Sequence, residues 1–247
     1  MSTLDIVSLA LAAILGSAAQ SATGFGVALP VAPVAFALLS PADAVITVAT
    51  TSLMHNLLVL STRHRRLAVR TADAALLIAA ALPGLVLGAL IISHAPKAPM
   101  QLAVGLAILL AVLFRLHEPG RLTALASNLA GGLIGLLAGA LTTTVGINGP
   151  PLVIWLRARH VTLTQLRDTL AIIFLALNLA AIPSIATQGG TIPTTLLPAL
   201  ATGLIIGHVL GLQAHQRLPT RTVDRALIAI LITAAGASIF AGATTWH

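Results

Sequence analysis

Apolar runs of about the length of a membrane span follow one another along the chain, separated by short polar segments. About 20 residues of α-helix cross the hydrocarbon core of a bilayer. Runs close to that length predict single spans at about 42–61, 73–92, 100–114, 165–182, 194–212 and 224–241. The pattern therefore predicts an all-α, polytopic membrane protein whose surroundings are a lipid bilayer.

Two further apolar runs, residues 4–39 and 122–156, are too long for one comfortable span and short for two. Each is interrupted by Gly, Pro, hydroxyl and amide residues, at Gln20–Pro30 and at Thr142–Pro151. Glycine and proline break a helix and free backbone groups, which hydrocarbon tolerates only where they are buried in protein or line a polar cavity. Each run is expected to form a hairpin of broken helices, which either crosses the membrane or re-enters it.

The second half of the chain repeats the first. Similar elements recur at a spacing of 122 or 123 positions, and the pairs that matter are Gly24 with Gly146, Asn56 with Asn178, Gly84 with Gly207 and Gly88 with Gly211. Leucine and alanine match easily by chance in apolar sequences, so the paired Gly and Asn positions carry the comparison. They predict an internal duplication, with residues 1–120 and 121–247 as the two repeats.

Arginine placement predicts how the repeats are oriented. The arginine-rich loops at 63–70, 115–121, 157–167 and 213–225 are expected to face the cytoplasm. The loops at 40–43, 94–98 and 183–193 and both termini contain Lys97 as their only Lys or Arg, and are expected to face outward. The two halves would then be inverted-topology repeats, each a broken-helix hairpin plus three transmembrane helices.

Composition excludes several classes of function. Charged residues make up 8% of the chain against about 25% in soluble domains, so a soluble globule is excluded. The net charge of +7 does not indicate nucleic-acid binding, because the basic residues are scattered between apolar runs and aromatic residues make up 3%. There is no cysteine, no metal-ligand spacing and no hydrolase or nucleotide motif, so neither a catalytic residue, a metal nor a cofactor is expected.

The interrupted tips of the two hairpins are the predicted binding site. Broken helices direct the positive ends of their dipoles at the membrane midplane, and the tips and the following spans add neutral hydrogen-bonding groups. These features suit a small oxyanion. The predicted substrate-binding residues are Gln20, Ser21, Thr23, Gly24, Gly26, Asn56, Thr142, Thr143, Thr144, Gly146, Asn148, Gly149 and Asn178. The alternative is that these residues pack helices together, and that Asn56 and Asn178 form purely structural hydrogen bonds.

Titratable residues are scarce within the predicted spans. All six acidic residues lie near predicted helix ends, so no carboxylate is available at the midplane to carry a proton or sodium ion. His55 and His208 lie within spans and are candidates for proton coupling, the alternative being structural histidines. Arg167 and Asp168 are interpreted as an interfacial ion pair, the alternative being a clamp on the substrate.

The stretch Gln20–Pro30 with its early Gly-x-Gly, the span start SPADAVITVATTSLMHN, the basic loop, the G-x-x-x-G span and the repeated TTTVGINGPPLVIWL resemble the sulfite exporter TauE/SafE family. The resemblance covers essentially the whole chain. It implies a bacterial inner-membrane transporter of small sulfur-containing anions such as sulfite, sulfonates or sulfoacetate, usually working by export.

These patterns together predict a secondary transporter that exports a small anion, such as sulfite, a sulfonate or another organic acid, by alternating access around the two tips. The alternatives are a passive channel for a small solute and an intramembrane enzyme built on Ser21 and His55. The expected partners are the anionic substrate and the bilayer, without nucleic acid. Assembly with further copies of the chain is left open.

Overall fold

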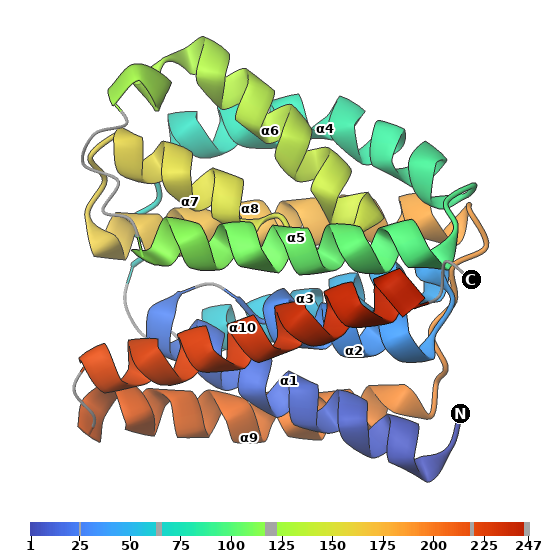
Figure 1. The fold of residues 1–247 in the computed structure, drawn as a ribbon. Helices are drawn as coiled ribbons and strands as arrows, with labels where there is room; N and C mark the ends of the chain where they lie inside the picture. The colour runs from blue at the N-terminus through green and yellow to red at the C-terminus, as the bar shows by residue number, and fades with distance from the viewer. Residues whose placement is uncertain (25, 63–65, 117–122, 218–219, 245–247) are drawn as a thin grey trace.

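The computed structural model describes residues 1–24, 26–62, 66–116, 123–217 and 220–244, which are almost entirely helical (Figure 1). The predicted boundary between the repeats, at residues 120 and 121, lies outside the described residues, as do most of the loop at 115–121 and part of the loop at 63–70. The helices are α1 (Thr3–Thr23), α2 (Ala28–Leu38), α3 (Pro41–Ser61), α4 (Thr71–Ile92), α5 (Lys97–Leu116), η2 (Thr123–Ala126), α6 (Asn128–Thr144), α7 (Gly149–Ala158), α8 (Leu163–Ala186), α9 (Leu196–Arg217) and α10 (Thr220–Thr244).

Both predicted hairpins are present, and each has one long and one short arm. Helix α1 has 21 residues and α2 has 11. Helix α6 has 17 residues and α7 has 10. At about 1.5 Å per residue, the short arms reach only about half-way through the molecule. Figure 1 shows that α2 and α7 start near the middle of the molecule and run to opposite ends, so their N-termini are both directed at its centre.

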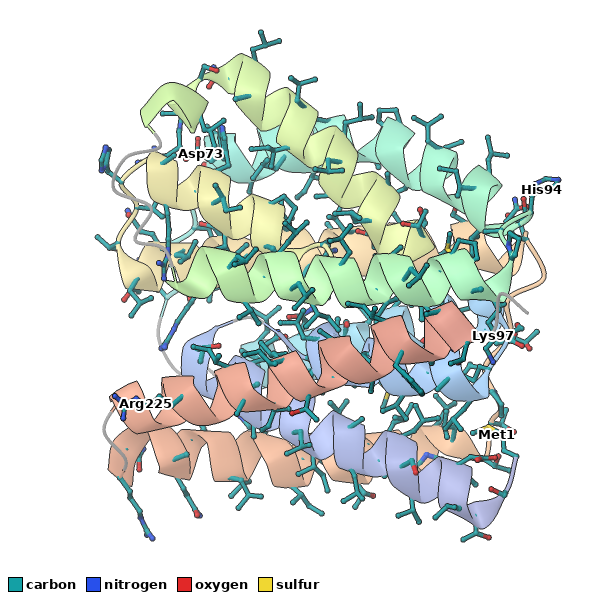
Figure 2. The ribbon with its side chains drawn as sticks, in the orientation of Figure 1. Met1, Asp73, His94, Lys97 and Arg225 are labelled. Atoms are coloured by element: carbon teal, nitrogen blue, oxygen red, sulfur yellow. The ribbon has the colours of Figure 1, made fainter. Side chains whose placement is uncertain are left out.

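The arginine-bearing segments lie together at one end of the helices. Figure 2 shows Asp73 and Arg225 at this end, which we call the arginine end, and Met1, His94 and Lys97 at the other. A helix that begins at one end finishes at the other, except in the two hairpins, whose arms return to the end from which they started. This arrangement is the one that the arginine pattern predicts; the side of the membrane that each end faces stays a prediction.

Helix packing pairs each half of the chain with the other. Helix α1 packs along α9, α4 along α6, α5 against α10, and α3 against α8 near the centre. Glycines make the first two contacts close: an added Cβ at Gly84 would overlap the Leu136 carbonyl oxygen, and one at Gly207 would overlap the Ile14 carbonyl oxygen. These four residues occupy matching positions of the predicted repeats. The contacts are those expected of two halves related by a twofold axis, and the inverted repeat itself stays a prediction.

The distribution of polar and apolar side chains is that of a membrane protein. Large apolar residues such as Leu4, Leu129 and Phe240 are exposed on the outside, whereas polar residues such as Gln20 and Asn56 are buried. Among the described residues, α1, α3, α4, α8 and the Leu196–Ala214 part of α9 are long and apolar enough to cross a bilayer. The protein is therefore a polytopic helical membrane protein, as its sequence predicts.

Two predicted boundaries are wrong. Helix α8 continues through Pro183 to Ala186, although a loop was expected from residue 183. Proline lacks only its own N–H and clashes only with one preceding carbonyl, and transmembrane helices tolerate this because neighbouring groups satisfy the freed backbone. The loop expected at 213–225 is also mostly helical, because α9 extends to Arg217 and α10 begins at Thr220.

Candidate functional site

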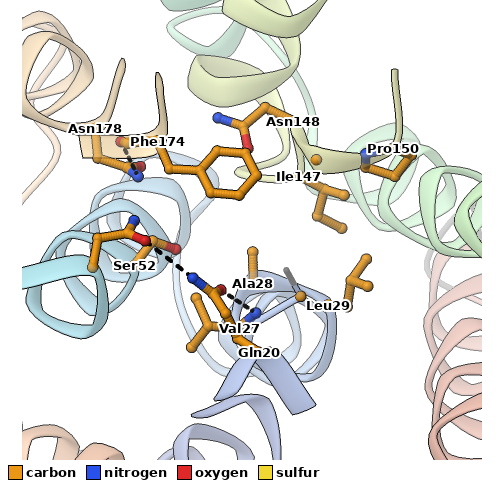
Figure 3. Close-up of a pocket in the computed structure, with 13 residues that line it drawn as sticks. Gln20, Val27, Ala28, Leu29, Ser52, Ile147, Asn148, Pro150, Phe174 and Asn178 are labelled. Atoms are coloured by element: carbon orange, nitrogen blue, oxygen red, sulfur yellow. Dashed lines mark hydrogen bonds between the residues drawn. The ribbon is translucent and has the colours of Figure 1, made fainter. Parts of the chain in front are cut away.

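A small pocket lies between the N-termini of the two short helices, and we call it the tip pocket. Its volume is about 20 Å³, which is room for about one water molecule. Figure 3 shows Asn148 and Phe174 on one side of it and Gln20, Val27 and Ala28 on the other. Its lining residues are Gln20, Gly26, Val27, Ala28, Leu29, Ser52, Asn56, Ile147, Asn148, Gly149, Pro150, Phe174 and Asn178.

Gln20 ties the first tip together. Gly24 and Gly26 have φ angles of 97° and 122°, in the left-handed region that glycine alone adopts without strain, and they reverse the chain after α1. The reversal brings the Val27 N–H back to Gln20, where it donates to Oε1 over 2.9 Å. The Gln20 Nε2 amide donates to Asn56 Oδ1 over 3.0 Å. The side chain of Gln20 therefore joins the tip to helix α3.

The second tip has different chemistry. Gly146 reverses the chain with a φ of 74°, and the Asn148 Nδ2 amide donates to Thr142 Oγ1 over 2.8 Å. The first turn of α7 contains Pro150 and Pro151, which have no N–H to offer. Asn178 donates to the Phe174 carbonyl of its own helix over 2.8 Å, as Figure 3 also shows. The second tip therefore presents fewer backbone donors to the pocket than the sequence pattern suggested.

A larger cavity of about 380 Å³ lies between the tip pocket and the arginine end, and we call it the arginine-end cavity. Its lining shares Gln20 and Asn56 with the tip pocket, so the hydrogen bond between these two side chains separates the two spaces. The Asn56 Nδ2 amide is buried and has no acceptor among the described residues. The cavity is lined by Gln20, Ser21, Gly24, Asn56, Val59, Thr62, Leu163, Thr164, Arg167, Ala171, His208 and Leu212.

Arg167 supplies the arginine-end cavity with a cation. Its Nη2 donates to the Ala22 carbonyl over 2.9 Å, and its buried Nε has no acceptor among the described residues. The expected Arg167–Asp168 ion pair is wrong, because the Asp168 carboxylate accepts the Ala68 N–H over 2.8 Å instead. Adjacent residues of a helix point about 100° apart, so Arg167 faces the first tip and Asp168 faces the segment before α4.

Two histidines lie beside this cavity. His55 on α3 and His208 on α9 have ring centroids 6.0 Å apart, in an edge-on arrangement. The His55 Nδ1 lies 3.0 Å from Ser17 Oγ, and the His208 Nδ1 lies 2.7 Å from Ser21 Oγ. His208 lines the cavity, whereas His55 is fully buried behind it. The structure therefore brings together the two histidines that were predicted separately.

Comparison with known families decides what kind of protein this is. The family described as "Sulfite exporter TauE/SafE" matches residues 9–239. The chain belongs to the sulfite exporter TauE/SafE family. The match confirms the resemblance seen in the sequence and makes the protein a membrane transporter of sulfite-type anions, within a family of transporters rather than of enzymes. No curated protein and no solved structure matches the chain.

Some predicted site residues of this TauE/SafE protein line neither described space. The hydroxyls of Thr23, Thr142 and Thr144 donate to carbonyls of their own helices. Thr143 donates across to the Leu85 carbonyl of α4 over 2.8 Å. An added Cβ at Gly146 would lie 2.6 Å from Val48, so this glycine allows close packing. These five residues make hydrogen bonds and packing contacts in the structure, and their role in substrate binding stays a prediction.

Other residues of the site were missed by the sequence prediction. They are Ser52 and Phe174 in the tip pocket and Thr62, Thr164 and Arg167 in the arginine-end cavity. The repeat could have found the first two, because Ser52 and Phe174 are 122 positions apart and each precedes its asparagine by four residues. Arg167 gave no such signal, because the equivalent position in the first half is Val45.

Proposed function

We propose that this TauE/SafE protein exports a sulfur oxyanion, sulfite or a sulfonate, across the bacterial inner membrane by alternating access. The observation that carries the proposal is the lining of the arginine-end cavity. It combines the guanidinium of Arg167 with neutral donors, and no described lining residue is a carboxylate. A cavity of this charge attracts anions and repels cations.

Arg167 suits an oxyanion in particular. A guanidinium presents its N–H groups as a planar fork that matches the oxygens of a sulfite or sulfonate group. Arg167 Nε and Asn56 Nδ2, which have no acceptor within the described part of the chain, are donors that an oxyanion in the cavity would satisfy. The hydroxyls of Thr62 and Thr164 line the same space and add further donors. The N-terminus of α2 then offers a partial positive charge deeper in the molecule.

The two ends of the molecule support alternating access. At the arginine end the cavity reaches Gln20 and Asn56. At the other end, the positions equivalent to the lining residues Arg167, Ala171 and His208 are packed: Val45, Ala49 and Leu85 are all buried. In a transporter with inverted repeats, an exchange of the conformations of the two halves closes one access path and opens the other. With the arginine end in the cytoplasm, the open cavity takes up anions from inside the cell, which fits export.

The decisive experiment is anion binding to the purified protein, with calorimetry on wild type, Arg167→Gln and Arg157→Gln. Arg157 is an exposed arginine at the same end and serves as the matched control. We expect sulfite and methanesulfonate to bind to wild type and to Arg157→Gln. The Arg167→Gln change removes a hydrogen bond from a charged group, worth about 1.5–3 kcal/mol, so affinity falls by roughly 10- to 150-fold.

Three outcomes would contradict parts of the proposal. Equal anion affinity in Arg167→Gln and wild type would show that the anion does not bind in the arginine-end cavity. Saturable counterflow of labelled sulfite in proteoliposomes is expected of a transporter, and its absence during rapid sulfite flux would favour the passive channel. Cysteine introduced at Arg217 should be labelled from the cytoplasm and cysteine at Lys97 from outside; the reverse result would overturn the orientation.

A further inference from the structure

Five polar side chains from three helices form a cluster beside the arginine-end cavity, which we call the histidine cluster. It consists of Ser17 and Ser21 of α1, His55 and Thr62 at the α3 segment, and His208 of α9. The cluster lies next to the residues that separate the cavity from the tip pocket, because Asn56 follows His55 and Gln20 precedes Ser21. No carboxylate lies in the middle of a described helix, so this cluster is where the protein could hold a proton.

Hydrogen bonds determine which nitrogen of His55 carries its proton. Ser17 has one hydroxyl proton, and it donates this proton to the Leu204 carbonyl over 2.6 Å. Its oxygen can therefore only accept from His55, so Nδ1 of the neutral ring carries the hydrogen. The other nitrogen, Nε2, is then an unprotonated acceptor. It is buried and has no partner among the described residues.

His208 is paired at both nitrogens. The Thr62 hydroxyl donates to the carbonyls of Leu58 and Val59 over 3.0 and 3.1 Å. It therefore accepts the His208 Nε2–H over 3.3 Å, which leaves Nδ1 to accept the Ser21 hydroxyl proton over 2.7 Å. His208 is thus satisfied as a neutral ring, and it faces the cavity. Counting only partners that the structure describes, the unmet acceptor of the cluster is therefore Nε2 of His55.

We propose that the histidine cluster binds one proton together with the transported anion. The proton enters from water in the arginine-end cavity, past His208, and forms an N–H bond at the free Nε2 of His55. The hydronium ion that delivers it becomes water, and the charge of the cluster changes from 0 to +1. A second proton is opposed because it would place two like charges on rings 6.0 Å apart in a poorly polar interior.

The charges around the cluster determine whether anion binding favours or opposes binding of the proton. Helix α1 presents Ser17, Gln20 and Ser21, and α2 and α6, which also contact α3, contain no titratable side chain. Helix α8 contributes Arg167, which lines the cavity together with His208, and Asp168, which is bonded to Ala68. The positive charge of Arg167 opposes protonation of the cluster, and so does the burial of His55, which disfavours any charged form. An anion bound at Arg167 cancels that charge and favours protonation, so proton and anion bind cooperatively.

This inference rests on the proposed anion transport and is tested by calorimetry with methanesulfonate, the anion of a strong acid, which takes up no proton itself. Titrations in two buffers with different ionisation enthalpies count the protons taken up by the protein. We expect at most one proton per bound anion, with uptake that increases as the pH falls below neutral, because burial disfavours the charged form of His55. We also expect affinity to rise roughly 5- to 150-fold as the pH falls through the range where histidines titrate.

Variants separate the cluster from other histidines. His55→Leu and His208→Leu introduce the residues found at the equivalent positions 177 and 85, and His55→Gln keeps a polar side chain in case the leucine variant fails to fold. His94→Gln changes an exposed histidine at the opposite end and is the matched control. We expect the two His55 variants to bind methanesulfonate without proton uptake, and the control to behave as wild type.

The outcomes distinguish this inference from the proposed function. Wild type that binds methanesulfonate with no proton uptake, or His55→Gln that retains full uptake, overturns the coupling and leaves anion transport standing. Wild type that binds neither methanesulfonate nor sulfite overturns both. Loss of uptake in His94→Gln would move the proton site away from the cluster and also overturn the inference.

Discussion

The contact between α1 and α9 and the contact between α6 and α4 are built on the same glycine spacing and differ in polarity. In the first, the Ser17 hydroxyl bridges to the Leu204 carbonyl. In the second, the equivalent position is Gly139, where an added Cβ would overlap the Ala81 carbonyl oxygen. At this pair of matching positions, one contact holds a hydroxyl between its helices, whereas the other brings the two backbones directly together.

The same difference extends to the neighbouring residues. His55 and His208 occupy the places that Leu177 and Leu85 hold in the other half. Glycines at matching positions set the distance between the helices in both halves, while the side chains between them differ. The comparison teaches that helix spacing and polar side chains are independent features of the repeat. The spacing follows from small residues in both halves, whereas the polar side chains are present in one half only.

The largest loss of stability is expected at the glycines that set the helix spacing in both contacts. Gly84→Ala places a methyl group against the Leu136 carbonyl, and Gly207→Ala does the same at Ile14. Overpacking of this kind costs about 1–3 kcal/mol or more, so both variants should lose stability by similar amounts in thermal unfolding in detergent. Gly132→Ala is the control, because an added Cβ there meets nothing within 4 Å. A loss of stability in only one of the two variants would show that the two helix contacts are not equivalent.

A smaller effect is expected at the polar contact. Ser17→Ala leaves the buried His55 Nδ1–H without its acceptor, and an unsatisfied buried group costs about 1–3 kcal/mol. The unfolding temperature should fall, and the His55→Leu change in the same chain should restore part of the loss because it removes the orphaned donor. Additive losses in the double variant would show that the two side chains are not coupled.

The smallest effect is expected at the apolar contact. Thr143→Val removes the hydroxyl that bonds the Leu85 carbonyl while keeping the shape of the side chain. That carbonyl lies inside helix α4, where a backbone N–H remains available to it, so the cost should be about 0.5–1.5 kcal/mol. Thermal unfolding of Thr143→Val and Ser17→Ala, measured side by side, tests whether the loss of stability is smaller at Thr143. A larger loss at Thr143 would show that this contact also depends on its polar group.

Much of the fold follows from local sequence. Gly24, Gly26 and Gly146 adopt positive φ angles where the hairpins were expected to break, and Ser40 caps α3 directly before Pro41. Helix length was harder to predict, since α8 passes through Pro183. A proline ends a helix in water more readily than in a bundle whose neighbours satisfy the freed carbonyl.

The candidate site was less predictable because it depends on contacts between residues distant in sequence. The hydroxyls of Thr142 and Thr144 looked like ligands but bond to their own helices, a choice that the residue type alone does not reveal. Arg167 looked like half of a local ion pair, yet it faces a tip that is more than 140 residues away in the sequence. The direction of a helical side chain depends on how the helix is docked, which local sequence does not encode.

Gly24 has a mechanical consequence for the transporter. An added Cβ on it would lie 2.5 Å from Cγ of Arg167, so the tip of the first half rests on the methylene stem of an arginine from the second half. The backbone at Gly24 has no side chain that could interdigitate with the methylene groups of Arg167. The glycine therefore lets the stem of Arg167 pass directly under the first tip, while the guanidinium reaches the Ala22 carbonyl of the same tip. Any side chain at position 24 would overlap the Arg167 stem and push the two halves apart.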